Sequence, residues 1–375
     1  MKGRAISGLA IAALFCGSFW GIISPTIALA QSFADKFSSG MQNKQSKVAI
    51  SLQEANTNVP SFPNTAPPPP RALPPKLPQG TDYRVSALQT DSTGGLWIGS
   101  WRGLSKINPT TGVVLKEVSL PNYTIDSLVM DKVGRIWLGT YEGLLRVDPR
   151  SNEVTAQTIT LPSNRVLSLL IDRRGYLWVG TDQGIILVSP DEGLIMTTWR
   201  SLPGTSANAL TLDNEGQLWI GTLEGLVRVN TATAQPLSRI PEVLGGMVQA
   251  LATNSRDGTI WAGTPNGLIV VDPKLGAVSR VIIATRDRNV TSLKFANDGS
   301  LWVGTDNGLL KLDPASGNIT GQVPSLPSSW VMALSPDTAN KLWIGTSQGL
   351  AWMLNGTGEV RTHLGFNPPS PEVGQ

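Results

Sequence analysis

The sequence predicts an all-β protein built as a single seven-bladed β-propeller, with four antiparallel strands in each blade. Three observations support this architecture: a repeat of about 41 residues, a tryptophan block in every repeat, and glycines at fixed places around it. The chain has 375 residues, of which 39 are glycine and 27 are proline, a content normal in turn-rich β proteins. Its hydrophobic fraction of 41% is sufficient to build a large core.

A tryptophan in a Leu/Ile-Trp-x-Gly-Ser/Thr block is the strongest repeated feature. Glycine lies two and six residues after each of these tryptophans, and three residues before it stands glycine or, in the seventh unit, Asn340. One four-stranded blade cannot bury both of its faces, so we expect each large indole to lie between two adjacent blades. The structural tryptophans are Trp97, Trp137, Trp178, Trp219, Trp261, Trp302 and Trp343, at spacings of 40, 41, 41, 42, 41 and 41 residues.

Each repeat divides into four short strands. The first, such as Val166–Leu170, ends in an Asp-x-x-Gly turn, in which Asp accepts backbone hydrogen bonds and Gly supplies a positive φ. Asn340 fits the glycine place because Asn tolerates that backbone region. The tryptophan block is the second strand, and a two-residue tip leads through glycine into the third, such as Gly308–Leu312. The fourth strand, such as Val113–Val118, follows a turn that is often Asp-Pro.

The ends of the repeated region predict how the ring closes. The first unit begins with its own inner strand at Val85, and the last ends with an outer strand near Glu359–Leu364. No blade then mixes strands from both ends of the chain. We expect the ring to close through packing of the last blade on the first, with Trp97 and Trp343 sharing the seam.

Residues 1–30 have the pattern of an export signal. Lys2 and Arg4 precede an apolar stretch, and the Ala28–Ala30 segment is a small-x-small cleavage site. We expect cleavage after Ala30 and a periplasmic or secreted mature chain; retention of the segment as an anchor is the alternative. No other stretch of about 18 apolar residues occurs, so we expect no membrane span in the mature chain.

A linker and a propeller follow the signal. We expect residues 31–82 to be largely disordered, polar at first and then proline-rich. The four consecutive prolines at 67–70 favour polyproline II, and no basic or aromatic pattern flanks them, which favours a spacer over a docking ligand. The propeller is expected over residues 83–366, with a disordered tail at 367–375.

Composition excludes several classes of function. The 30 basic and 27 acidic residues become 28 and 27 if Lys2 and Arg4 are removed, which leaves a net charge of +1. Such a balance differs from the concentrated basic face of a nucleic-acid-binding protein. The single cysteine and single histidine, Cys16 and His363, cannot form a disulfide framework or a Cys/His zinc site. We therefore predict no cofactor, no metal and no catalytic residues, and we expect a monomer.

The repeat Asp-x-x-Gly-x-Leu-Trp-Ile-Gly-Thr-x-x-Gly-Leu, followed by Asp-Pro, resembles the two-component regulator propeller repeat. The resemblance covers seven units over about residues 83–366. It implies a propeller similar to the periplasmic sensor regions of bacterial hybrid histidine kinases, which usually carry two propellers, a β-sandwich, a membrane helix and a kinase. This sequence has one propeller, so we expect a stand-alone exported chain that does not signal to a kinase of its own.

These observations favour a non-enzymatic module that binds a protein or a small ligand in the periplasm or at the cell surface. One alternative is a lyase similar to the streptogramin lyases, or another lyase or hydrolase. The streptogramin lyases are seven-bladed propellers, but they use a histidine base and a divalent metal. Here His363 is expected in the last strand, with no second histidine, which favours an ordinary strand or edge residue. A second alternative is an assembly factor for a membrane protein complex.

The candidate binding surface follows from differences among the repeats. The Asp-x-x-Gly turns hardly vary, whereas the tips between second and third strands differ in every unit, and the residues that enter the first strand also vary. These tips and entries emerge on one face, so their variation favours a specialised surface, although exposed tips can also drift freely. Aromatic and arginine residues are the usual anchors of such surfaces. We predict a surface centred on blades 7, 1 and 2 and formed by Arg84, Trp101, Arg102, Tyr123, Tyr141, Arg165, Asp182, Asp306 and Trp330.

Overall fold

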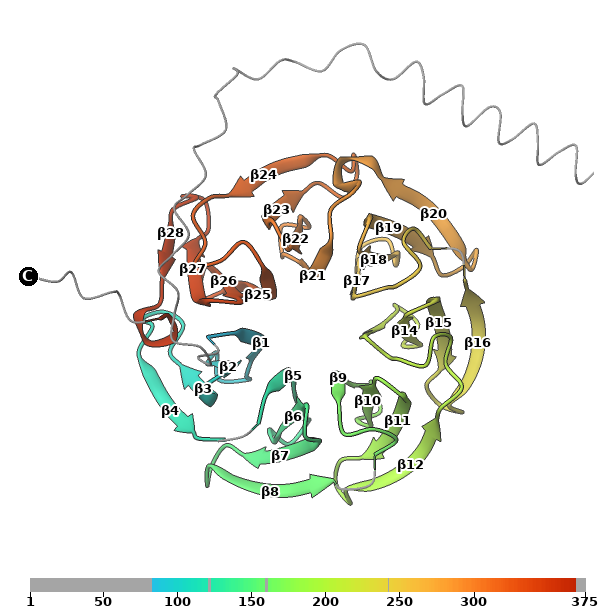
Figure 1. Cartoon of the computed structure of the whole chain (residues 1–375), viewed down its shortest axis with the longest axis horizontal. Coiled ribbons are helices and arrows are strands. Elements are labelled where there is room, and N and C mark those ends of the chain that lie inside the picture. The colour runs from blue at the N-terminus through green and yellow to red at the C-terminus, as the bar shows by residue number, and fades with distance from the viewer. Residues whose placement is uncertain (1–82, 121–122, 159–160, 242, 369–375) are drawn as a thin grey trace, which may run out of the picture. The chain divides into compact units, whose positions relative to one another are not determined.

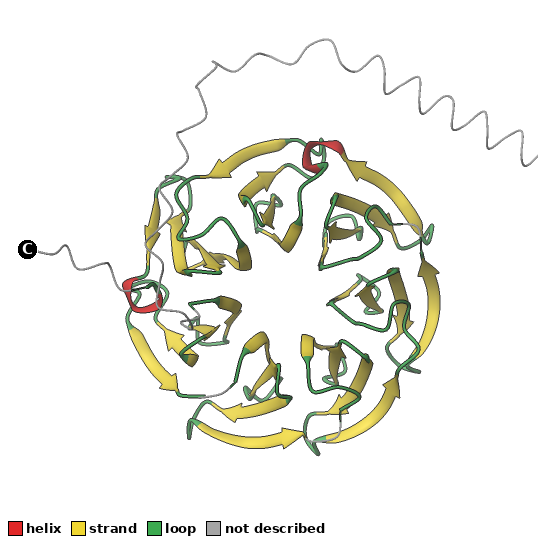
Figure 2. Cartoon of the chain, viewed as in Figure 1, coloured by secondary structure: helices red, strands yellow, loops and turns green. Residues whose placement is uncertain are grey.

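The structure, a computed structural model, describes residues 83–368 apart from 121–122, 159–160 and 242. The predicted signal peptide at 1–30 and linker at 31–82 lie outside the described residues. Seven four-stranded antiparallel sheets stand around one axis (Figure 1), which confirms the predicted fold class. Within the described residues only two short 3₁₀ segments, η1 (Ile283–Thr285) and η2 (Leu364–Phe366), interrupt the strands and loops (Figure 2).

The strands of each blade follow one another in the chain from the axis outwards. The inner strands are β1 (Val85–Thr90), β5 (Ile125–Met130), β9 (Val166–Ile171), β13 (Ala209–Leu212), β17 (Ala250–Thr253), β21 (Val290–Phe295) and β25 (Val331–Thr338). The second strands are β2 (Leu96–Ser100), β6 (Ile136–Thr140), β10 (Leu177–Thr181), β14 (Leu218–Thr222), β18 (Ile260–Thr264), β22 (Leu301–Thr305) and β26 (Lys341–Thr346). The third strands are β3 (Gly103–Ile107), β7 (Leu144–Asp148), β11 (Gly184–Ser189), β15 (Gly225–Asn230), β19 (Gly267–Asp272), β23 (Gly308–Leu312) and β27 (Gly349–Leu354). The outer strands are β4 (Val114–Val118), β8 (Glu153–Thr158), β12 (Leu194–Trp199), β16 (Gln235–Ile240), β20 (Ala277–Ile282), β24 (Ile319–Val323) and β28 (Val360–Thr362).

The core of the described propeller is divided among the interfaces between blades. Seven clusters of buried hydrophobic residues each join two neighbouring blades, and each contains one repeat tryptophan. Trp219 of blade 4, for example, packs with Ile260 and Ala262 of blade 5. The prediction that each indole lies between blades is confirmed. Burial of one tryptophan removes about 200 Å² from water, worth roughly 5 kcal/mol at 25 cal/mol per Å² as an upper bound.

The ring closes where blade 7 packs on blade 1, in the same way as every other pair of neighbouring blades. The outer strand of blade 7 is β28, and no blade mixes strands from both ends of the described chain, as predicted. A Cβ atom added at Gly345 of blade 7 would clash with the carbonyl oxygen of Val85 in blade 1, which shows how closely the two blades approach. The prediction for the seam tryptophans was half wrong. Trp343 lies at the seam, but Trp97 packs on blade 2, because each indole extends towards the following blade.

Polar contacts also join blade 7 to blade 1. The Lys341 ammonium, almost buried, donates hydrogen bonds to the carbonyl oxygens of Pro109 (2.9 Å) and Thr110 (2.7 Å). His363 follows β28 rather than lying within it, and its Nε2 lies 2.7 Å from the carbonyl oxygen of Gly112. Its ring packs on Phe366 with 5.1 Å between centroids. His363 is therefore part of the seam.

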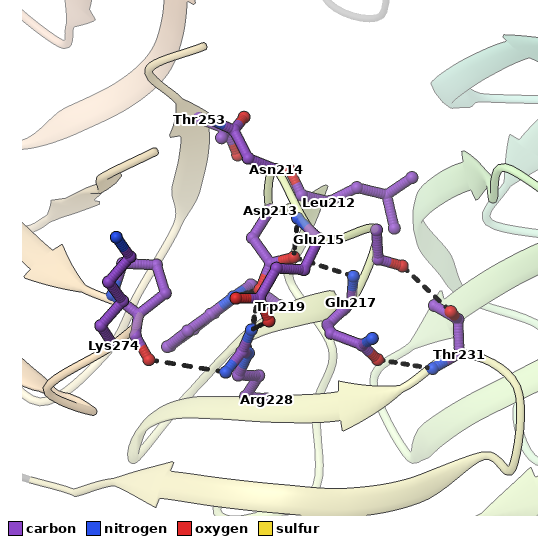
Figure 3. Close-up of polar contacts among 12 residues, drawn as sticks. Leu212, Asp213, Asn214, Glu215, Gln217, Trp219, Arg228, Thr231, Thr253 and Lys274 are labelled. Carbon is purple, nitrogen blue, oxygen red and sulfur yellow. Dashed lines mark hydrogen bonds and ion pairs between the residues drawn. The ribbon is translucent and has the colours of Figure 1, made fainter. Parts of the chain in front are cut away.

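The Asp of the Asp-x-x-Gly turn connects the turn to the tryptophan of the next strand. In blade 4, Oδ1 of Asp213 accepts the backbone N–H groups of Glu215 and Gln217, at 3.0 and 2.9 Å. Its Oδ2 accepts the indole N–H of Trp219 at 3.0 Å and pairs with Arg228 at 2.6 Å (Figure 3). The backbone bonds confirm the predicted turn, whereas the indole bond was not predicted. The same indole–carboxylate bond joins Trp97 to Asp91, Trp137 to Asp131 and Trp178 to Asp172.

Candidate functional site

The predicted surface lies at one end of the blades, named here the tip face. It contains the tips between second and third strands and the residues that enter the inner strands; the opposite end, with the Asp-x-x-Gly turns, is named the turn face. In blade 1 the backbone N–H of Trp101 at the tip donates to the carbonyl oxygen of Arg84 at the entry, at 3.2 Å. The same bond joins Ser347 to Trp330 in blade 7 at 3.1 Å. Tip and entry are thus direct neighbours, as the strand order predicted.

A buried threonine fixes the backbone of the tip in blades 2 to 7. In blade 4 the hydroxyl of Thr222 donates to the carbonyl oxygen of Gly225 at 3.0 Å and accepts the N–H of Glu224 at 3.2 Å. The two tip side chains, Leu223 and Glu224 in this blade, take no part in these bonds. The backbone of the tip is therefore constant while its side chains vary. The threonines are Thr140, Thr181, Thr222, Thr264, Thr305 and Thr346.

An aromatic and arginine group forms the tip of blade 1. The Trp101 ring is 42% exposed and meets the Tyr83 ring edge-on, with 5.2 Å between centroids. The Arg102 guanidinium lies 5.9 Å from the Trp101 ring and pairs with Glu117 at 2.8 Å. It also donates to the carbonyl oxygen of Gly365 at 2.7 Å. Arg102 is therefore held in place, while Trp101 leaves much of its ring open to solvent.

A second aromatic and arginine pair bridges blades 2 and 3. The Arg165 guanidinium lies 4.6 Å from the centroid of the Tyr141 ring and donates to the Tyr141 hydroxyl at 2.9 Å. Both side chains remain exposed. Because the guanidinium stacks on the ring, it has lost part of its freedom before any partner arrives, which lowers the entropic cost of binding.

The remaining predicted residues differ in their surroundings. Trp330 of blade 7 is half exposed, and its backbone N–H donates to the hydroxyl of Ser328. Tyr123 is half-buried and packs against the cluster between blades 1 and 2, so it supports this face more than it extends from it. Asp182 and Asp306 belong to blades 3 and 6, outside the group of blades 7, 1 and 2. One carboxylate oxygen of Asp182 is buried without a hydrogen-bond partner.

One charged residue on the axis escaped the sequence reasoning. Lys294 of β21 lines a cavity of about 600 Å³ that the inner strands surround in the turn-face half of the propeller. Its side chain is exposed in this cavity. A comparison of the seven units reveals this residue. Lys294 pairs with the repeat tryptophan Trp302 across neighbouring strands, and in the other six blades the residue that pairs with the repeat tryptophan is uncharged. Those residues are Gln89, Val129, Leu170, Thr211, Ala252 and Ser335.

Among the described residues, no three His, Cys, Asp or Glu side chains gather closely enough to hold a metal ion. The same part of the chain contains no helix of the length and apolar character needed to cross a membrane. The described residues thus give no structural basis for a metal centre.

The sequence profile of the two component regulator propeller matches residues 119–142, 160–183, 201–224 and 325–348. Each match ends at the tip of a blade and includes its turn and its tryptophan strand. The chain carries two-component regulator propeller repeats. With the seven-bladed ring, this confirms the resemblance noted in the sequence. No curated protein sequence matches the chain.

Solved structures similar to the chain include the extracellular domains of two proteins of B. thetaiotaomicron. One is the extracellular domain of BT4673, assigned as a hybrid two component system, with TM-score 0.62 and 22% identity over 74% of this chain. The other is the corresponding domain of BT3049, with TM-score 0.58 and 22% identity over 71% of this chain. The chain spans only 38% and 39% of those two domains. Such identities establish the shared fold alone.

A lyase has a similar fold. Virginiamycin B lyase from Staphylococcus aureus has TM-score 0.61 and 16% identity, and the match covers 72% of this chain and 93% of the lyase. The propeller ring is therefore shared by extracellular domains of two component systems and by an enzyme. The function of this chain has to be argued from its own side chains.

Proposed function

We propose that this protein is a non-enzymatic binding module that acts in the periplasm or at the cell surface, and that the tip face of blades 7, 1 and 2 binds its partner. The observation that carries this proposal is the set of exposed rings and arginines at tips whose backbone is bonded to a buried threonine or, in blade 1, to Ser100. Residues 1–30 would direct export, residues 31–82 would serve as a spacer, and residues 83–366 would form the binding module.

The chemistry of the surface indicates the kind of partner. Arginine offers a planar fork of five donors that suits carboxylates, and an aromatic ring offers rigid contact area at a low cost in entropy. Trp101, Tyr141 and Arg165 combine both at the tips of adjacent blades. We therefore expect an acidic or mixed polar and apolar partner, rather than a purely hydrophobic one.

A lyase or hydrolase is the competing interpretation, favoured by the fold that the chain shares with virginiamycin B lyase. His363 supports the non-enzymatic alternative, because its Nε2 is engaged with the carbonyl oxygen of Gly112 and its ring lies among aromatic side chains at the seam. A role as an assembly factor would use the same tip face, and the identity of the captured partner would distinguish it from a sensor role.

The test is partner capture by the mature chain from the extracellular or periplasmic fraction of the source organism. The double variant Trp101→Ala with Arg165→Ala should lose a partner that the wild type retains, while its melting temperature stays nearly unchanged. A matched control changes the aromatic and arginine pair of the turn face, Arg174→Ala with Tyr176→Ala, whose separation of 4.7 Å is similar.

The control variant should still capture the partner, although the loss of the Arg174 pair with Asp172 should lower its stability. If the control variant, still folded, loses the partner and the tip variant keeps it, the working face has been assigned to the wrong end. Turnover of a small-molecule panel by the wild type would contradict the non-enzymatic assignment, and His363→Ala would show whether that turnover depends on the histidine.

A further inference from the structure

The axial cavity is a second site, separate from the tip face. It has a volume of about 600 Å³, within the roughly 300–1,000 Å³ of small-molecule sites. The inner strands of blades 1 to 6 line it (Figure 1). Each inner strand pairs only with the second strand of its own blade, so its other edge of peptide N–H and C=O groups is turned to the axis. Side chains such as Met130 and Leu170 add apolar surface to this polar edge.

Lys294 is the one charged side chain among the residues that line this cavity. Across the described ranges of the chain its ammonium makes no hydrogen bond or ion pair with another residue, and its side chain is open to the cavity. It also borders a neighbouring cavity of about 440 Å³, where Asp337 lies. The Asp337 carboxylate is engaged by the N–H of Asn297 (2.6 Å) and the amide of Asn355 (3.1 Å). Asp337 keeps its negative charge, but within the described residues no ion pair joins it to Lys294, so the ammonium has no direct protein partner.

The fold does not need this cation. Six blades have an uncharged residue at the equivalent place, with the same pairing to the repeat tryptophan and the same position on the inner strand. The repeat therefore does not require a lysine at this place, and Lys294 gives blade 6 alone a cation here. Its side chain is exposed to the cavity, so its ammonium is accessible to an anionic ligand.

We propose that the axial cavity binds a small organic carboxylate with an apolar body, and that the carboxylate pairs with the ammonium of Lys294. The carboxylate can also accept hydrogen bonds from the free peptide edges of the inner strands, while the body covers side chains such as Leu170 and Met130. An inorganic anion would leave that apolar surface exposed. The site lies in the turn-face half of the ring, so it does not depend on the tip-face proposal.

The experiment is isothermal titration of the mature protein with hexanoate, compared with hexylamine and with sulfate. Hexanoate should bind, hexylamine should not, and sulfate should bind at least tenfold more weakly than hexanoate. Lys294→Met should weaken hexanoate binding at least tenfold, and Lys294→Arg should largely retain it. Lys274→Met, which removes a lysine from an exposed turn, is the matched control and should bind as the wild type does.

Thermal unfolding provides a second readout. Without ligand, Lys294→Met should melt close to the wild type, because the Lys294 side chain is exposed. Saturating hexanoate should raise the melting temperature of the wild type but not of Lys294→Met. Equal hexanoate binding by the wild type and Lys294→Met would overturn the proposal. Equal binding of sulfate and hexanoate would also overturn it, because the site would then hold an adventitious ion only. The double variant Trp101→Ala with Arg165→Ala should bind hexanoate as the wild type does. The proposal for the cavity and the proposal for the tip face are therefore tested independently.

Discussion

At both ends of the blades a fixed polar group holds the backbone while the exposed residues vary, but the exposed residues differ in kind. Asp91, Asp131, Asp172 and Asp213 all accept an indole N–H and fix a turn of the same form. In blades 2 to 7 a buried threonine holds the tip, and the two tip residues change from blade to blade. The exposed residues inside the turns, such as Lys132 and Asn214, change as well. The tips of blades 1 and 2 are distinguished by the exposed rings of Trp101 and Tyr141.

The turn face itself becomes less regular around the ring. In blade 5 the indole N–H of Trp261 donates to the hydroxyl of Thr259 at 3.1 Å instead of to a carboxylate. In blade 7 the indole N–H of Trp343 is buried without a partner, and the Lys341 ammonium lies 5.6 Å from its ring. The indole–carboxylate bond is therefore one solution among several, and the packing between blades is the constant feature. This ordering sets the expected sizes of the effects below.

The largest loss of stability is expected when a tryptophan that links the turn face to the core is replaced. Trp219→Ala removes a fully buried indole, its bond to Asp213 and its packing on blade 5. The free energy of unfolding should fall by about 3–5 kcal/mol. Denaturant melts measure this change, and a loss as small as that of a tip tryptophan would show that the strand register is wrong.

A smaller effect is expected from a single turn carboxylate. Burial acts to raise the pKa of Asp91, but the hydrogen bonds from Lys106, Thr93 and the turn backbone outweigh it and lower the pKa from 3.8 to about 2. The carboxylate therefore stabilises the fold above about pH 4, and this contribution is lost as the pH falls towards 2. Asp91→Asn should cost about 1.5–3 kcal/mol at neutral pH.

Urea melts of wild type and Asp91→Asn between pH 7 and pH 2 measure this prediction. The difference between the two proteins should shrink as the pH falls from 4 to 2. Asp306→Asn on the tip face is the comparison and should change stability by less than about 0.5 kcal/mol at neutral pH. A constant Asp91→Asn difference down to pH 2 would show that the carboxylate charge does not stabilise the turn.

Loss of the threonine bonds that fix the tip backbone should lower stability more than truncation of a tip side chain. Thr222→Val keeps the shape of a buried residue but removes the hydroxyl that bonds to Gly225 and Glu224. A cost of about 1–2 kcal/mol follows from the lost bonds. Leu223→Ala in the same tip should cost less than about 0.5 kcal/mol, and equal costs for the two variants would remove the distinction between fixed backbone and variable side chains.

The smallest effect on stability is expected from the exposed rings. Trp101→Ala and Trp330→Ala should each cost less than about 1 kcal/mol, because much of each ring is already in water. Denaturant melts decide this as well. A cost of several kcal/mol for Trp330→Ala would assign that residue to the scaffold and remove it from the proposed surface.

The fold could be predicted because the same residues recur seven times, so each copy confirms the others. The glycine that is Gly345 in blade 7 and the tryptophan that is Trp219 in blade 4 recur at the same place in every blade. The direction of Trp97 could not be predicted, since the repeat pattern is the same whichever neighbour the indole faces. Lys294 was missed although it stands eight residues before its tryptophan, as its counterparts do in every blade except the fifth. A comparison of the units at that place would have shown it as the one charged residue.

The candidate surface was predictable only in part. Alternation of the strands places Trp101 and Trp330 at the same end of their blades, and the structure has them there. The stack of Arg165 on Tyr141 joins two blades, and the pairing of Arg102 with Glu117 joins a tip to an outer strand. Such contacts depend on side-chain direction across elements far apart in the sequence. The sequence therefore indicates which residues are exposed, and the structure indicates which of them are fixed in position by contacts with other side chains.

Hydroxyl-radical footprinting of the mature chain, free and with its captured partner, tests the tip-face assignment most directly. The method reports the solvent access of individual side chains in one experiment. The proposal predicts protection of Trp101, Tyr141 and Trp330 on the tip face, with Tyr176 and Leu275 on the turn face unchanged. Protection of Tyr176 and Leu275, with the three tip-face residues unchanged, would contradict it and assign partner binding to the turn face.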